Sequence, residues 1–524
     1  MHILEWLTLL MLAATALTTL ARRIGAPYPA LLALGGAALA FAPGAPILQI
    51  EPSLALALFI APILVDAAYD ASLRDLKDNW LPIGTLAIVA VILTSLAVAF
   101  VVVALAPGIP FAAALALGAA VAPPDAAAAT AVLRHMRPPH RIRVILEGES
   151  LFNDASALLI YQLAVAATLA GAFDVAQIAP NAALTAFGGV AYGWVLAIPF
   201  SRILRLIADA PTLVVLQFAA AFAVWMSAEH LHLSAVLAVV AFGLAQNQRA
   251  PRTVSAALRV PTHAAWESAV FLLNILAFTL IGLQLRPIVT RLTADEQASF
   301  ALVAGAVALT VIVVRLVWSL TYIAAVRAKN QRFGVRTPRP MAAPSFAGGI
   351  AVGWGGMRGI VTLAAVYALP IAFPQRDLIV VCAFAVVLVT LVLQGLTLGP
   401  LIRALRLRDD GQIEREVLAA RAETEQAVLE ALRRTPTSEE GRRLMRETKR
   451  ALLELDPRRE TPQAIAEERA LRQRMVAVRR RVLADMLADG RIGDDAYREI
   501  EDELDRAELA LESGPSQRSV IEPG

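Results

Sequence analysis

Long apolar segments separated by short connections dominate this chain of 524 residues. A helix needs about 20 mostly apolar residues to cross a bilayer, and in lipid its backbone must satisfy its own hydrogen bonds. Hydrophobic residues make up 58% of the chain and charged residues 17%, against about 45–50% and about 25% in soluble domains. The sequence therefore predicts an all-α polytopic membrane protein. About thirteen spans are expected, near residues 3–21, 27–42, 52–70, 81–106, 111–133, 146–171, 181–207, 211–229, 232–248, 264–285, 299–326, 346–371 and 377–402.

Basic residues concentrate in alternate connections. Arg22 and Arg23 follow the first span, Arg74 and Lys77 the third, and further Lys or Arg residues follow the fifth, seventh, ninth and eleventh. Cytoplasmic loops carry the excess of Lys and Arg. The N-terminus is therefore expected outside and the C-terminal region in the cytoplasm, which requires an odd number of spans.

The composition changes near Leu407 to a region rich in Ala, Leu, Glu and Arg. This predicts a transmembrane domain over 1–405 and a cytoplasmic helical region over 406–524, broken near Pro436, Pro457 and Gly490. A solvated tail and a regulatory or dimer-supporting tail both fit the pattern. The net charge of +3 gives no case for binding nucleic acid, and the single cysteine, Cys382, permits no multi-cysteine metal site.

A polar cluster interrupts the apolar stretch that runs from about residue 146 to 171. It contains Glu149, Ser150, Asn153 and Asp154, and residues four apart lie on one side of a helix. A carboxylate at membrane depth is costly, so its default interpretation is a functional site. Clustered oxygen ligands indicate a place that holds a small cation or a proton.

Two spans are interrupted. Pro123, Pro124 and Asp125 break the fifth span, and the segment Gly353–Gly359 breaks the twelfth. Proline removes a backbone donor, and irregular backbone at membrane depth persists only within protein or along a cavity. Asp125 falls where a second half-helix could begin. Interruptions at corresponding places in two halves indicate an inverted-repeat transporter.

Charge balance adds a constraint on the spans. Asp66, Asp125, Glu149 and Asp154 are candidate anions, and two arginines, Arg315 and Arg358, are candidate cations. A buried arginine keeps its proton and requires an anion. Structural pairing of both arginines would leave at least one carboxylate able to exchange H⁺ for another cation.

These residues resemble the monovalent cation:proton antiporter-1 family, the sodium/proton exchangers of the bacterial NhaP and animal NHE type. The resemblance covers most of residues 1–405, and its most specific element is the segment Gly148–Asp154. Supporting elements are Asp66-Ala67-Ala68-Tyr69, Gly282-Leu283-Gln284-Leu285 and Gly355-Gly356-Met357-Arg358-Gly359.

The resemblance implies a role for each matching position. Asp154 would bind the cation or the proton with support from Ser150, and Asn153 would hold the geometry of the site. The break would supply the Pro124 carbonyl and a half-helix cap at Asp125. Structural ion pairs would join Arg315 to Glu149 and Arg358 to Asp66. The implied protein is a homodimer in a bacterial inner membrane whose core domain, with two crossed broken helices, moves against a dimerisation domain.

Two positions depart from the family pattern. Thr-Asp-Pro is common at the first break, whereas this chain has Pro124-Asp125-Ala126, so the hydroxyl of the threonine is missing. The acid in the third span is usually Glu and here is Asp66, one methylene shorter. Either change could alter ion preference.

Exchange by competition is the expected function. Burial disfavours a charged carboxylate, so either H⁺ or a hard cation such as Na⁺ neutralises Asp154, and oxygen ligands suit a hard cation. Because Asn153 stands beside the single acid, one H⁺ per cation and electroneutral exchange are expected, with no cofactor and no enzymatic activity. The alternatives are K⁺ as the cation, an ion channel, a membrane enzyme with Ser150 as nucleophile, and a sensor that does not transport.

Overall fold

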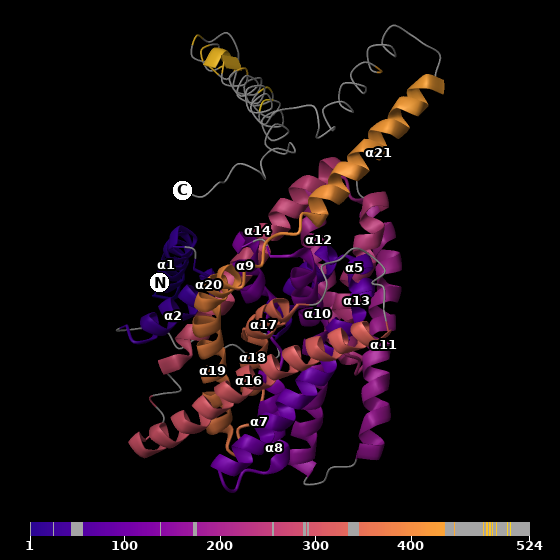
Figure 1. Cartoon of the computed structure of the whole chain (residues 1–524). Coiled ribbons are helices and arrows are strands. Elements are labelled where there is room, and N and C mark those ends of the chain that lie inside the picture. The colour runs from indigo at the N-terminus through magenta and orange to yellow at the C-terminus, as the bar shows by residue number, and fades with distance from the viewer. Residues whose placement is uncertain are drawn as a thin grey trace. The chain divides into compact units, whose positions relative to one another are not determined.

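The structure is a computed structural model, and it describes residues 2–24, 26–42, 56–136, 138–170, 175–253, 256–286, 290, 293–333 and 345–434, with isolated positions between 445 and 504. Within these ranges every regular element is helical (Figure 1). The chain divides into two compact units, Met1–Asp410 and Gly411–Gly524. The expected breaks near Pro436, Pro457 and Gly490 lie outside the described residues, and the second unit contributes α21 (Gln412–Arg434).

The first unit begins with α1 (His2–Ile24), α2 (Tyr28–Ala40), η1 (Leu56–Ile60), α4 (Ala61–Asp70), α5 (Leu73–Asp78), α6 (Trp80–Gly84), η2 (Thr85–Ala90), α7 (Val91–Leu105), α8 (Phe111–Val121), α9 (Ala126–Met136) and α10 (His140–Ala170). It continues with α11 (Val175–Ile203), η3 (Leu204–Leu206), α12 (Ala210–His230), α13 (Ala235–Thr253), α14 (Ala256–Leu283), α16 (Ala294–Phe333), α17 (Phe346–Trp354), α18 (Ile360–Tyr367), α19 (Arg376–Val389), η4 (Thr390–Gln394) and α20 (Gly395–Ala404).

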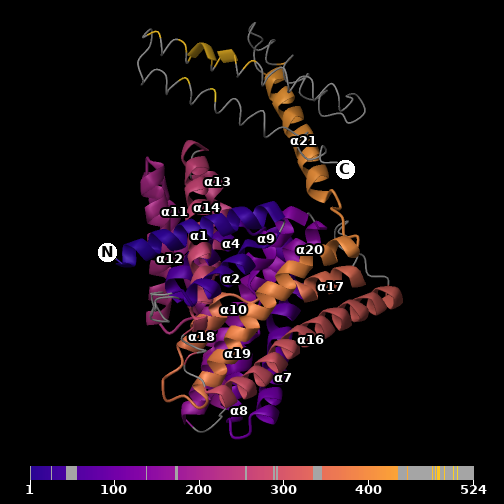
Figure 2. The same cartoon turned by 90° about the vertical axis from the view of Figure 1, so that its left-hand side faces the viewer.

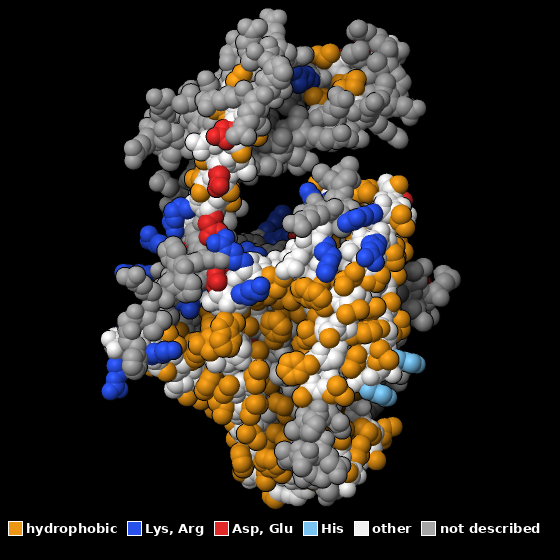
Figure 3. Space-filling view, turned by 90° about the vertical axis from the view of Figure 1, so that its right-hand side faces the viewer, with side chains coloured by type: hydrophobic (Ala, Val, Ile, Leu, Met, Phe, Trp, Pro, Cys, Tyr) orange, Lys and Arg blue, Asp and Glu red, His pale blue; other side chains and the backbone are white. Residues whose placement is uncertain are grey.

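Seven helices among the described residues are long and apolar enough to cross a membrane: Trp80–Leu105, His140–Ala170, Ala183–Leu206, Ala210–His230, Leu258–Leu283, Glu296–Arg332 and Arg376–Ala404. Two shorter apolar helices are Tyr28–Ala40 and Phe111–Val121. On the face seen in Figure 3, apolar side chains form a broad belt, and Lys and Arg side chains gather along one edge of it. The all-helical membrane architecture is confirmed, whereas the count of about thirteen spans stays a prediction.

Buried apolar side chains form two main clusters. One is centred on α7, α8, α16 and α19, which pack against one another (Figure 2). The second is built from α4, α11, α12, α13 and α14. The polar helix α10 contributes to both clusters. Two packed groups of helices therefore flank the segment that carries the candidate site.

Both expected interruptions are present, and they touch each other. Between α8 and α9 the chain leaves the helix at Pro123 and Pro124, which lack the N–H that a continuing helix requires. Between α17 and α18 the interruption covers residues 355–359, of which three are glycines. The Asp125 N–H donates a hydrogen bond of 2.6 Å to the Met357 carbonyl. The prediction of two broken helices that cross is confirmed.

Candidate ion site

Helix α10 brings its polar residues into contact with the first break. Asn153 is buried, and its amide nitrogen donates a hydrogen bond of 3.0 Å to the Pro124 carbonyl oxygen. Because a proline carbonyl in a broken helix has no helical partner four residues on, a side-chain donor satisfies it. The structure thus brings Asn153 and Pro124 together, with Asp154 on the next position of α10.

A cavity of about 440 Å³ reaches Asp154. Four residues expected at the site share its wall: Asp66, Asp125, Ser150 and Asp154. Its described lining residues come from α1, α2, η1, α4, α9, α10, α14 and α18 and from the connections beside them. The side chain of Asp154 is buried, so the cavity gives a small ion access to a carboxylate that is otherwise enclosed by protein.

Asp125 belongs to the first break and contacts the second. It directly precedes α9, where a carboxylate is favourable near the exposed N–H groups of a helix start. Gly359 lies against it, since a Cβ atom added to Gly359 would overlap the Asp125 carboxylate. The backbone of Gly359 is extended, so the closeness of Asp125 excludes a side chain here. Asp125 and Asp154 are close enough for their carboxylates to interact.

The Glu149–Arg315 pair is enclosed away from the cavity. Two parallel hydrogen bonds join the guanidinium of Arg315, from α16, to the Glu149 carboxylate: Nη1 to Oε1, and Nη2 to Oε2 at 2.8 Å. Nη2 also donates to the Val352 carbonyl at 3.2 Å. Both side chains are buried. The expected contact is present, and Glu149 is absent from the described residues that line the cavity.

Arg358 differs from its expected pairing with Asp66. Its side chain is fully buried and donates to three backbone carbonyls, those of Val121 (3.0 Å), Ala122 (3.1 Å) and Gly356. Each carbonyl belongs to a broken helix and is therefore available as an acceptor. Asp66 instead lies on the cavity wall. The two breaks thus supply the oxygens that hold this arginine.

Three residues outside the expected set also contribute. Thr390, in η4, accepts a 3.0 Å hydrogen bond from the backbone N–H of Arg358. Thr130 on α9 and Glu267 on α14 line the cavity. The sequence feature that could have indicated a role for Thr390 is a polar threonine within an apolar span. Its usual bond to its own helix, here to the Val386 carbonyl at 2.8 Å, makes that signal weak.

Comparisons with known proteins agree with this architecture. A family model described as "Sodium/hydrogen exchanger, transmembrane" matches residues 9–404. A "Sodium, potassium, lithium and rubidium/H(+) antiporter" of Bacillus pumilus is 30% identical over 370 residues, covering 67% of this chain and 54% of that protein. The chain thus spans about half the length of this relative.

Two further proteins are similar. The "Low-affinity Na(+)/H(+) antiporter NhaS1" of Synechocystis is 28% identical over 391 residues, 73% of this chain and 70% of that protein. The structure of the sodium proton antiporter MjNhaP1 from Methanocaldococcus jannaschii superposes with a TM-score of 0.58 at 18% identity, over 78% of this chain and 99% of that one. This second likeness concerns the fold.

Proposed function

The chain belongs to the sodium/hydrogen exchanger family, and from that premise we propose that it exchanges a monovalent cation, Na⁺ in the first instance, for H⁺. The observation that carries the proposal is the cavity that leads to the buried Asp154. Exchange needs one group that either ion can neutralise, and a route by which the ions reach it. K⁺ is the alternative cation.

Asp154 is the proposed carrier group. Its bare carboxylate is costly in a buried position, so it favours a bound proton or a bound cation. Ser150 and Asp125 line the same cavity and add oxygen ligands, which suit a hard monovalent cation. H⁺ and the cation compete for one carboxylate, and this competition couples their movements.

The charges support exchange of one ion for one proton. Glu149 is neutralised by Arg315. Asn153, which carries no charge, stands beside Asp154 on α10, so the one carboxylate at these two positions can be neutralised by one H⁺ or by one monovalent cation. We expect the neutralised site to move across the membrane and the transport to be electroneutral.

Alternating access fits the two helix groups. Side chains of both apolar clusters line the cavity, Phe278 from the first and Leu64 and Val270 from the second. A movement of one group of helices against the other would therefore close the cavity and open a route to the opposite side. We place the protein in a bacterial inner membrane as a homodimer, with its N-terminus outside and residues 406–524 in the cytoplasm. The gathering of Lys and Arg at one edge of the apolar belt supports this orientation.

Proton flux in vesicles tests the proposal. Purified protein in liposomes with an internal pH dye receives Na⁺, K⁺ or Li⁺ in turn. Asp154→Asn should abolish cation-driven pH change while the protein remains folded, because an amide cannot titrate. The matched control is Asp209→Asn, at an exposed residue in the connection before α12, where asparagine can still cap the helix. Retained exchange in Asp154→Asn would refute this assignment, and a voltage-dependent current at symmetric pH would refute electroneutrality.

A further inference from the structure

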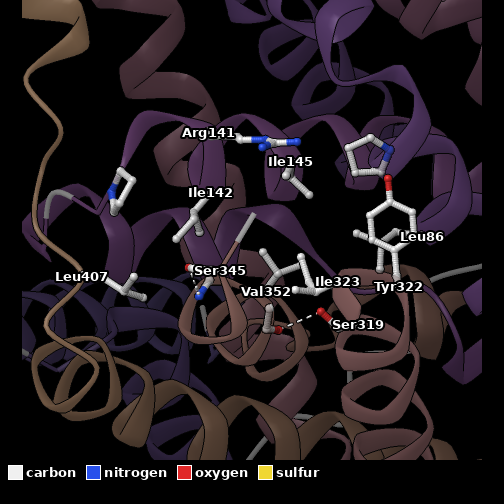
Figure 4. A pocket seen from close by; sticks show the side chains of 14 residues that line it. Leu86, Arg141, Ile142, Ile145, Ser319, Tyr322, Ile323, Ser345, Val352 and Leu407 are labelled. Carbon is white, nitrogen blue, oxygen red and sulfur yellow. Dashed lines mark hydrogen bonds between the residues drawn. The ribbon is translucent and has the colours of Figure 1, made fainter. Parts of the chain in front are cut away.

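Described residues form two cavities besides the ion cavity. The first, of about 80 Å³, is lined mainly by α10, α16 and α17 (Figure 4) and has room for a few water molecules. The second, of about 340 Å³, lies among α4, α11, α12, α13 and α14, and we call it the α4–α14 cavity. Small-molecule sites measure about 300–1,000 Å³. Of these two cavities, the α4–α14 cavity is therefore the one that can hold a small organic ligand.

Helices α4 and α14 stand between this cavity and the ion cavity. On α14, Glu267 and Phe271 line the ion cavity, whereas Thr262 and Trp266 line the α4–α14 cavity. On α4, Asp66 lines both cavities. A ligand in the α4–α14 cavity would thus occupy a space of its own, beside the ion site and against the same two helices.

Aromatic side chains form much of the wall of the α4–α14 cavity. Phe200 on α11 and Phe242 on α13 pack with their ring centroids 5.2 Å apart. Trp266 and Tyr69 join them on the wall, and Phe200, Phe242 and Trp266 are buried. Aromatic rings favour further rings in offset or edge-to-face contact. The wall therefore suits a small planar aromatic group.

Two buried polar atoms of the wall have no hydrogen-bond partner within the described part of the chain. Gln246 on α13 is 5% exposed, and its amide nitrogen donates a 3.0 Å hydrogen bond to the Ala197 carbonyl. That bond fixes the amide and leaves the Gln246 Oε1 without a donor. The hydroxyl of Thr262, also 5% exposed, has no partner either. Because buried polar groups are normally hydrogen-bonded, these atoms indicate a bound molecule that carries an N–H or O–H group.

Basic side chains stand at the rim of the cavity. Arg259 and His263 are exposed and lie four residues apart on one side of α14. Arg259 is close enough to Tyr69 on the wall to interact with it electrostatically. The sequence has no Asp or Glu from 230 to 266, which covers α13 and the start of α14. The acid among the described lining residues is Asp66, on the side shared with the ion cavity. The rim on α14 thus favours a negative group.

From these features we infer that the α4–α14 cavity binds a small planar aromatic acid. Its ring would lie among Phe200, Phe242 and Trp266. A ring N–H would donate to the Gln246 Oε1, and the acid group would meet Arg259 at the rim.

Equilibrium dialysis of the full chain in detergent tests this inference, with empty micelles as the correction for partitioning. The probes are radiolabelled indole-3-acetate, neutral indole and the cation tryptamine, which share one ring. We expect indole-3-acetate to bind about fivefold more tightly than indole, the ratio that corresponds to ~1 kcal/mol for one exposed ion pair, and tryptamine to bind more weakly than indole. Benzofuran-3-acetate lacks the ring N–H and should bind about fivefold more weakly than indole-3-acetate, since a neutral hydrogen bond contributes ~1 kcal/mol.

Variants separate the charge from the shape. Arg259→Gln should lower the affinity for indole-3-acetate to that for indole, and Arg403→Gln, at an exposed arginine of α20 outside the cavity, should leave it unchanged. Val260→Trp should weaken binding of all three indole probes, because residue 260 lines the cavity and is 69% exposed, so the larger side chain can cover the rim. No saturable binding of indole-3-acetate, tryptamine binding as tightly as the acid, or a preference that survives Arg259→Gln would overturn the inference. The wild-type comparison decides it even where a variant does not fold.

Discussion

Removing either partner of the buried Glu149–Arg315 pair should destabilise the protein far more than removing both. The two side chains are joined by two parallel hydrogen bonds and are almost fully enclosed. A single substitution leaves one buried charge without compensation, which costs about 3–5 kcal/mol, whereas apolar replacement of a whole buried pair is often neutral or stabilising by about 1–4 kcal/mol. The variants are Glu149→Leu, Arg315→Met and their combination.

The structure also predicts an order for the two single variants. Arg358 is close enough to Glu149 and Arg315 to interact with both charges. Without Glu149, two buried guanidinium groups face each other; without Arg315, Glu149 still has Arg358 nearby. Glu149→Leu should therefore lower the free energy of unfolding more than Arg315→Met does. Methionine is shorter than arginine and flexible, so it fits beside Gly356, which lies against the Arg315 side chain.

Unfolding by SDS of detergent-solubilised protein, followed by tryptophan fluorescence, gives the free energies. The single losses should sum to about 6–10 kcal/mol and the double variant should lose little, so the departure from additivity should be about 6 kcal/mol or more. A single variant too unstable to measure, beside a folded double variant, supports the same conclusion. Additive losses, or a double variant less stable than both singles, would show that the reasoning about uncompensated charge is wrong.

Two further outcomes follow from particular contacts. Gly359→Ala should abolish cation-driven proton flux in vesicles, because the added Cβ would displace the Asp125 carboxylate. Gly305→Ala should retain the flux, because a Cβ added there meets no atom within 4 Å. Equal activity of the two variants would contradict this reasoning. Hydrogen bonds from Thr212 hold the pKa of Asp209 below its usual value. The wild type should therefore be more stable than an Asp209→Ala variant by a difference that is complete above pH ~4, the ordinary aspartate pKa. This difference should disappear as the pH falls through the lower pKa of Asp209 in the folded protein. A difference in thermal unfolding temperature that stays constant from pH 7 to pH 3 would exclude this linkage.

The sequence predicted the broken helices because their cause is local. Pro123 and Pro124 cannot donate backbone hydrogen bonds, and a run of glycines offers little helix propensity. The pairing of Glu149 with Arg315 was implied by the resemblance to the antiporter family, because charge balance alone required only that each buried arginine meet an anion. Whether each expected span crosses the membrane is less accessible to sequence, because helices such as Tyr28–Ala40 and Phe111–Val121 are shorter than the about 20 residues that a bilayer requires.

The tertiary packing of the helices determines which acids line the cavity, which the sequence did not predict. Several residues that line the cavity together with those of α10, such as Glu267 and Asp66, come from helices distant in sequence. Glu267 lies near the start of its apolar stretch, where an interfacial position is the more common outcome. Its place on the cavity wall depends on how α14 packs beside α2 and α4. The hydropathy and spacing of residues within α14 do not predict that packing.

The contacts of Arg358 show why counting side-chain charges is an incomplete guide inside a membrane protein. A buried arginine needs compensation, and only acids are visible as partners in a sequence. Every residue has a carbonyl, and a carbonyl becomes an available acceptor when its helix is interrupted. The breaks after Val121 and Trp354 provide such oxygens from both broken helices, and Arg358 binds Val121, Ala122 and Gly356. The same interruption that shapes the ion site thereby holds the arginine, so substitutions that restore a continuous helix in either place should disturb both.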